Sequence, residues 1–98
     1  MKKTDALHGV NVAFVGAGAM GTAMIGGLLS RQDLEPNRIT ASDRHRERLA
    51  DIRDQFEITT TLNNRTVVKN ADVVVLSVKP QVLPDVLAEL KGHIKPGA

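Results

Sequence analysis

The stretch VAFVGAGAMG, residues 12–21, constrains the fold of this chain most strongly, because an apolar run ends abruptly in closely spaced glycines. The run from Val10 to Val15 is short and apolar, which is typical of a strand buried on both faces of a parallel sheet. Gly16, Gly18 and Gly21 then follow with G-x-G-x-x-G spacing and open a helical segment. This order indicates either a turn that binds the phosphates of a dinucleotide or a tight turn without a ligand.

The segment from Ala19 to about Arg31 is predicted to be a helix. Its apolar positions at helical spacing are Met20, Ala23, Met24 and Leu28, with Ile25 as a further candidate. Gly26 and Gly27 interrupt this pattern, and a glycine in a helix interior costs about 1 kcal/mol relative to alanine. We interpret both glycines as positions where the helix approaches its neighbours closely.

Strand and helix signals alternate along the rest of the chain. We predict strands over 38–43, 57–61 (at a sheet edge) and 72–78 (in the middle of a sheet), and helices over 44–56, 63–71 and 84–90. Asn63 is a candidate helix cap, and Gly92 closes the last helix. The order β-α-β-α-β-α-β-α predicts an α/β fold, the amino-terminal half of a Rossmann-like, doubly wound parallel sheet.

Length and composition limit the function classes. A chain of 98 residues is expected to form one domain, here an NAD(P)-binding domain over residues 1–98. The chain stops where another strand would normally begin, so we expect it to be part of a longer, two-domain protein. A net charge of +2 and an aromatic content of only two phenylalanines argue against nucleic acid as a partner.

The chain contains no cysteine, which excludes disulfides, thiolate metal sites and cysteine nucleophiles and suits the cytoplasm. The start MKKTDALHGVN does not have the pattern of a signal peptide, and no apolar run approaches the roughly 20 residues of a membrane span. His8, His45 and His93 match no common metal-site spacing. We therefore expect no metal, no membrane partner and a cytoplasmic location.

The three glycines of the loop have different predicted roles. Gly16 allows the tight turn, Gly18 allows the backbone to approach a pyrophosphate, and Gly21 allows close packing of helix and strand. The free N–H groups and the helix dipole at the start of the helix attract phosphate.

Asp43 and Arg44 follow the second predicted strand and favour different cofactors. An acid at this position commonly binds the adenosine ribose of NAD, whereas an adjacent arginine commonly receives the 2′-phosphate of NADP. Arg44 can also stack on adenine. Asp43 could instead cap the next helix. A 2′-phosphate would be repelled by Asp43, but Arg44, Arg46 and Arg48 could offset this if one or two of them point inward, while Arg46 and Arg48 also fit a solvated helix face. We favour NADP and leave NAD open.

The stretch VVVLSVKPQVLPDVL places polar groups at the end of the fourth strand. Ligands of such sheets bind outside the carboxyl ends of the strands, so Ser77, Val78, Lys79 and Pro80 would flank the nicotinamide. Lys79 could place a cation near the nicotinamide ribose or a substrate carboxylate, or it could simply face solvent.

Three stretches together, VAFVGAGAMGTAMIGGLL, ITASDRHRERL and NADVVVLSVKPQVLPDVL, resemble pyrroline-5-carboxylate reductases, from about Val10 to Leu90. The resemblance implies NAD(P)H-dependent reduction of pyrroline-5-carboxylate to L-proline, the last step of proline biosynthesis. It implies a pyrophosphate site at the loop, an adenosine site with an asparagine near a phosphate, and a nicotinamide side. The implied cofactor-binding residues are Gly16, Ala17, Gly18, Ala19, Met20, Gly21, Ser42, Asp43, Arg44, Asn64, Val78, Lys79 and Pro80.

The chain also departs from that family. Ala19 stands where the family often has asparagine, and Asp43 occupies a variable position. The family's helical C-terminal domain, which makes the oligomer and holds the imine, is not part of the 98 residues. No catalytic residue can therefore be named, and we expect the chain alone to be inactive. The alternatives are the cofactor domain of a coenzyme F420-dependent NADP reductase or of a β-hydroxyacid or prephenate dehydrogenase, and a non-catalytic nucleotide-sensing module.

Overall fold

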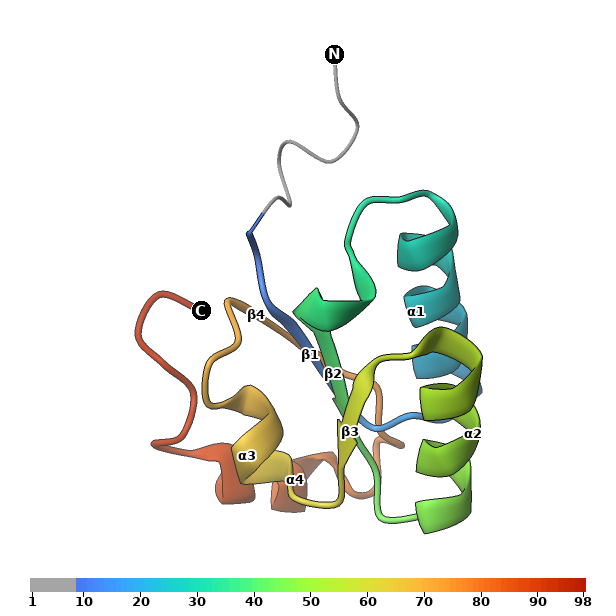
Figure 1. The fold of residues 1–98 in the computed structure, drawn as a ribbon. Helices are drawn as coiled ribbons and strands as arrows, with labels where there is room; N and C mark the ends of the chain where they lie inside the picture. The colour runs from blue at the N-terminus through green and yellow to red at the C-terminus, as the bar shows by residue number, and fades with distance from the viewer. Residues whose placement is uncertain (1–8) are drawn as a thin grey trace.

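A sheet of four parallel strands forms the centre of the computed structural model, which describes residues 9–98 (Figure 1). Strands and helices alternate along the chain as β1 Val12–Val15, α1 Ala19–Ser30, β2 Ile39–Ser42, α2 Arg46–Phe56, β3 Thr59–Thr61, α3 Asn64–Val68, β4 Val73–Leu76 and α4 Leu83–Leu90. A 3₁₀ turn, η2 Pro36–Arg38, precedes β2. The predicted α/β class and Rossmann-like parallel sheet are confirmed.

Helices cover both faces of the sheet, with α1 and α2 on one face and α3 and α4 on the other (Figure 1). The side chains of β1 alternate between the two cores, as the two-residue period of a strand requires. Val12 and Phe14 join the core under α1 and α2, whereas Ala13 and Val15 join the core under α3 and α4. All four are buried, so β1 is the central element of the fold.

The sheet order β3-β2-β1-β4 corrects one prediction. β3 lies at an edge as predicted, but β4 lies at the opposite edge and not in the middle. Val73 and Leu76 of β4 are 43% and 37% exposed, and no strand within residues 9–98 pairs with their outer side. An apolar β-branched run indicates a tendency to be buried, but it does not specify which neighbours do the burying.

The buried face of α1 also differs from the predicted stripe. Gly21 and Ile25 face the sheet, while Met20 and Met24 are 70% and 41% exposed. Because a glycine adds no apolar side chain to a hydrophobic pattern, the periodicity of the sequence does not indicate the face of α1 that packs most closely on the sheet.

The close approach inferred for Gly26 and Gly27 is also wrong. A Cβ on Gly26 would lie an ordinary 3.5 Å from the Phe56 ring, and one on Gly27 would have no neighbour within 4 Å.

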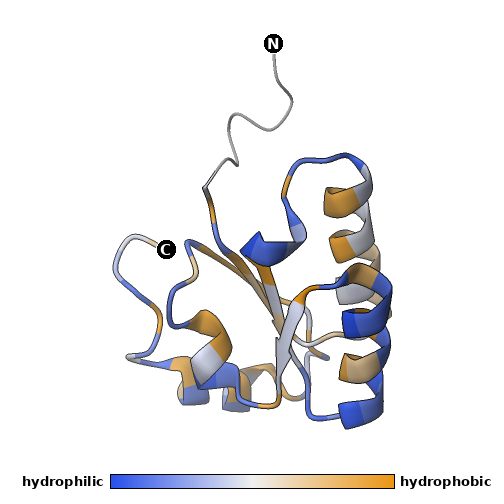
Figure 2. Ribbon diagram, in the orientation of Figure 1, coloured by the Kyte–Doolittle hydropathy of each residue, from blue (hydrophilic) through white to orange (hydrophobic). Residues whose placement is uncertain are grey.

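Helix α2 is amphipathic, with Leu49 and Ile52 buried and charged residues outside (Figure 2). The Asn63 side chain caps α3 by accepting hydrogen bonds from the N–H groups of Arg65 and Thr66. Gly92 follows α4 with a φ of +83°, the left-handed conformation expected of a closing glycine. Within the described part of the chain, no helix has the length and apolar character of a membrane span.

Candidate dinucleotide-binding site

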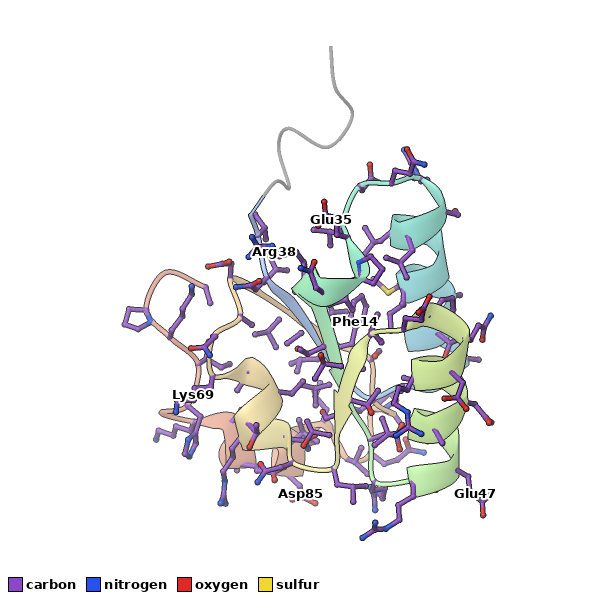
Figure 3. The ribbon with its side chains drawn as sticks, in the orientation of Figure 1. Phe14, Glu35, Arg38, Glu47, Lys69 and Asp85 are labelled. Carbon is purple, nitrogen blue, oxygen red and sulfur yellow. The ribbon has the colours of Figure 1, made fainter. Side chains whose placement is uncertain are left out.

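The glycine loop lies where the direction of the chain reverses across the sheet. From β1 the chain moves to β2 and β3 on one side, and it then crosses back to β4 on the other side of β1. In open parallel sheets, ligands bind at such a switch point, outside the carboxyl ends of the strands. Glu47 and Asp85 lie at this end of the molecule, whereas Glu35 and Arg38 lie at the opposite end (Figure 3).

Gly16 and Gly21 hold the loop against the end of β4. Gly16 has a φ of +99°, and a Cβ there would lie 2.6 Å from the carbonyl oxygen of Ser77. A Cβ on Gly21 would lie 2.7 Å from the Gly16 carbonyl oxygen and 2.8 Å from Ser77 Oγ. The N–H of Gly16 also donates to the carbonyl of Ser42, at 2.8 Å. The tight turn at Gly16 and the close packing at Gly21 are therefore confirmed.

Gly18 faces open space. A Cβ at this position would have only one neighbour within 4 Å, the guanidinium of Arg48 at 3.8 Å. Gly18 is also the N-cap of α1, where no side chain caps the helix and no acidic residue lies in the first turn. The first turn of the helix therefore presents N–H groups that no side chain caps, which is the arrangement that binds phosphate at a helix N-terminus.

Asp43 is 8% exposed, and its carboxylate faces the loop. Oδ2 accepts the N–H of Ala17 at 2.9 Å and Arg48 Nη1 at 3.1 Å. Oδ1 accepts the N–H of His45 at 3.0 Å and contacts His45 Nδ1 at 2.8 Å. Burial alone would raise the pKa of Asp43, but these hydrogen bonds outweigh it and lower the pKa to about 2.

Ser42 and Asn64 belong to a chain of hydrogen bonds that is separate from the bonds of Asp43. Ser42 is fully buried, and its Oγ donates to Asn64 Oδ1 at 2.6 Å. Asn64 Nδ2 donates in turn to Glu89 Oε1 at 2.9 Å. These bonds connect β2, α3 and α4 and fix the direction of the Asn64 amide. One N–H of that amide is free of this chain of bonds.

The basic residues after β2 divide into two groups. Arg44 and Arg46 are exposed, and no ion pair or hydrogen bond involves their side chains within residues 9–98. Arg48 was expected on a solvated helix face, but its side chain turns back to Asp43 and stays 45% exposed. No sequence pattern distinguishes the two directions, because the charge of Arg48 is the same whether it faces solvent or Asp43.

The β4 side of the site contains the residues predicted to flank the nicotinamide. Val78 packs against the core under α3 and α4, while Lys79 and Pro80 are exposed. Ser77 is predicted from the sequence to flank the nicotinamide, and in the structure its Oγ donates to the Gly16 carbonyl of the loop at 2.6 Å. Its signal in the sequence is a lone small polar residue at the end of an apolar strand.

A shallow pocket lies away from the glycine loop, at the amino ends of the strands, and is lined by Asn11, Asn37, Arg38, Thr40, Thr66, Val67, Asn70 and Ala71. Its position does not match the carboxyl edge, where ligands of this fold bind. Among the described side chains, no group of three His, Asp or Glu residues is placed to hold a metal ion.

The model of a protein family described as "NADP oxidoreductase coenzyme F420-dependent" matches residues 11–97. The chain belongs to this family. Curated relatives include pyrroline-5-carboxylate reductases of Methanosarcina acetivorans, 36% identical over 83 residues, and Pseudomonas aeruginosa, 44% identical over 85 residues. These matches cover 85% and 87% of the chain but 31% of each relative, so the chain spans about a third of their length. The resemblance to pyrroline-5-carboxylate reductases is confirmed.

Solved structures of family members and more distant proteins share the fold. A pyrroline-5-carboxylate reductase of Coxiella burnetii is 38% identical with a TM-score of 0.80, and the match covers 84% of this chain and 30% of that one. A Plasmodium falciparum pyrroline carboxylate reductase with NADP bound is 19% identical, with a TM-score of 0.74 over 87% of this chain and 30% of that one. At that identity the second likeness establishes the fold alone.

Proposed function

We propose that this chain is the NADPH-binding domain of a pyrroline-5-carboxylate reductase. The observation that carries the proposal is the combination of a family match over residues 11–97 with an uncapped helix start at Gly18, where a Cβ would meet only Arg48 among the described residues. The relatives that match the same stretch are named for this reduction. In the whole protein, the small-molecule partner is a cyclic imine and the product is L-proline.

The residues of the chain bind and orient the cofactor in this proposal. The backbone of Gly16–Gly21 holds the pyrophosphate, with Ala17, Ala19 and Met20 contributing the amides between the glycines. Asn64 offers its free N–H to a phosphate on the adenosine side, and Val78, Lys79 and Pro80 line the nicotinamide side. The bound reduced nicotinamide supplies the hydride that adds to the C=N carbon.

Two features favour NADP over NAD. Asp43 has its oxygens occupied by the loop and α2, so it offers no free acceptor to a ribose hydroxyl. Arg44 is exposed beside it, and its side chain makes no hydrogen bond or ion pair within the described residues, so its guanidinium is available to a 2′-phosphate. The groups that hold the imine, donate its proton and form the homo-oligomer belong to the rest of the protein.

Titration of the chain with NADPH and NADH tests the proposal. We expect weak binding of NADPH, weaker binding of NADH, and no proline formation from pyrroline-5-carboxylate by these 98 residues. The test variant is Gly18→Leu, whose side chain would fill the open space at the loop without meeting the core. This variant should stay folded and lose on the order of a hundredfold in affinity for both cofactors, ~2.7 kcal/mol. Unchanged affinity would refute the binding role of the loop.

A further inference from the structure

The acid at the end of β2 points in an unexpected direction. In dinucleotide-binding sheets, an acid here commonly accepts hydrogen bonds from the adenosine ribose. The Asp43 side chain is only 6% exposed, and it faces the glycine loop on one side and the first turn of α2 on the other. It therefore lies inside the protein and not on the surface that a ribose would contact.

The hydrogen bonds of Asp43 leave it no capacity for a ligand. A carboxylate has about four lone-pair positions. Two are taken by backbone N–H groups, those of Ala17 and His45, and two by the side chains of His45 and Arg48, all at 2.8 to 3.1 Å. The low pKa of Asp43, about 2, means that the group carries its charge throughout the physiological range.

The groups that Asp43 holds are parts of the cofactor site itself. Ala17 lies between the two loop glycines Gly16 and Gly18, so the bond to its N–H fixes the orientation of the peptide planes that face the phosphates. Arg48 is the cation nearest to the open position at Gly18. One buried carboxylate thus sets both the backbone of the loop and the guanidinium in front of it.

We propose that Asp43 is a positioning residue for the phosphate-binding loop, and not the acid that binds the adenosine ribose. It acts through Ala17 and Arg48, and this role rests on the proposed function, nucleotide binding at the loop. Because NADPH and NADH share the pyrophosphate, Asp43 contributes equally to the binding of both. Selection of NADPH then falls to the exposed Arg44 and not to Asp43.

Binding by Asp43→Ala and Asp43→Asn distinguishes the two roles. We expect Asp43→Ala to lose about tenfold or more in affinity for both NADPH and NADH, as for loss of hydrogen bonds to a charged group, with their ratio unchanged. Asp43→Asn keeps one neutral acceptor and should lose less, again equally for both. Asp51→Asn is the matched control, because it removes the same charge from the exposed side of α2.

A probe of the adenosine half sharpens the result. Adenosine 2′,5′-bisphosphate lacks the pyrophosphate, so its affinity should fall less in Asp43→Ala than the affinity for NADPH. Loss confined to NADH, with a gain for NADPH, would show a ribose-binding acid and overturn the proposal. Unchanged affinity for both cofactors in a folded Asp43→Ala variant would also overturn it.

Amide hydrogen exchange provides a readout that needs no cofactor. In Asp43→Ala and Asp43→Asn, the N–H of Ala17 should exchange faster while the N–H of Phe14 in β1 keeps its protection. An Ala17 amide as protected as before in a folded Asp43→Ala variant would contradict the proposal. Where Asp43→Ala proves unstable, an Asp43→Asn variant in which the Ala17 protection and the affinities for both cofactors are all unchanged would contradict it. Failure of the unchanged chain to bind either cofactor would overturn the proposed function and this role together. Binding of both cofactors by the unchanged chain, with a loss in the Asp43 variants confined to NADH, would overturn this role alone.

Discussion

The carboxyl ends of β2 and β4 flank the same glycine loop but are built very differently. At the end of β2, Ser42 and Asp43 are buried and bonded to the loop, to α2 and to α3. At the end of β4, Ser77 alone bonds the loop through its side chain, and Lys79 and Pro80 stand in solvent. The β2 side of the site is thus fixed in advance by hydrogen bonds, whereas the β4 side is open.

This difference has a consequence for affinity. Groups that are already ordered lose little conformational entropy when a ligand binds, whereas exposed lysine side chains must be immobilised. We therefore expect the chain to derive its affinity for a dinucleotide mainly from the loop and the β2 side. The β4 side should contribute little to the affinity of these 98 residues.

The largest expected effect concerns the contact between the loop and β4. Gly16→Ala would place a Cβ 2.6 Å from the Ser77 carbonyl oxygen at a φ of +99°, so it should lower the free energy of unfolding by about 3 kcal/mol. Gly27→Ala is the control: it has space around its Cβ and should stabilise the chain by about 1 kcal/mol. Urea unfolding measures both. Equal stability of the two variants would mean that the loop is not held against β4.

The pH dependence of stability tests the β2 side. The pKa of Asp43 is lowered from 3.8 to about 2 in the folded chain, so its stabilisation is present above pH 3.8 and is lost as the pH falls through 2. The ionised Asp43 carboxylate therefore adds about 2 kcal/mol to the free energy of unfolding above pH 3.8. The pKa of Asp72 is also lowered, first by the N–H of Asn11 and then by Lys95, and it acts in the same direction. The difference between the unchanged chain and Asp43→Asn isolates Asp43, and parallel curves for the two would argue against the bonded carboxylate.

The smallest expected effects are changes in cofactor affinity, and they compare Arg44 on the β2 side with Lys79 on the β4 side. Arg44→Ala should weaken NADPH by ~1.5 kcal/mol through loss of a charge-assisted contact and should weaken NADH less. Lys79→Ala, on the β4 side, should change neither affinity in this chain by more than about 0.5 kcal/mol. Calorimetric titration measures all four affinities. Equal losses for both cofactors in Arg44→Ala would reject its role at a 2′-phosphate, and a large loss in Lys79→Ala would contradict the contrast between the sides.

Features of the site that involve neighbouring residues could be predicted from the sequence, whereas contacts between residues far apart in the sequence could not. The turn at Gly16 and the Asn63 cap follow from preferences of a few neighbouring residues, and both were predicted. The bonds from Asp43 to Ala17 and from Ser77 to Gly16 join residues 26 and 61 positions apart. No local pattern reports such contacts. Arg48 illustrates the same limit, since its charge and helical position permitted either solvent or Asp43.

The sequence by itself determined the alternation of strands and helices, the parallel sheet and the place of the glycine loop. These features depend on hydrophobic periodicity and on backbone conformations that glycine alone adopts easily, and both are written in short stretches of residues. Only the tertiary structure decided that β4 pairs with β1 and that Asp43 faces the loop. Strand order and side-chain direction are set by which surfaces pack together, and that competition involves the whole chain at once.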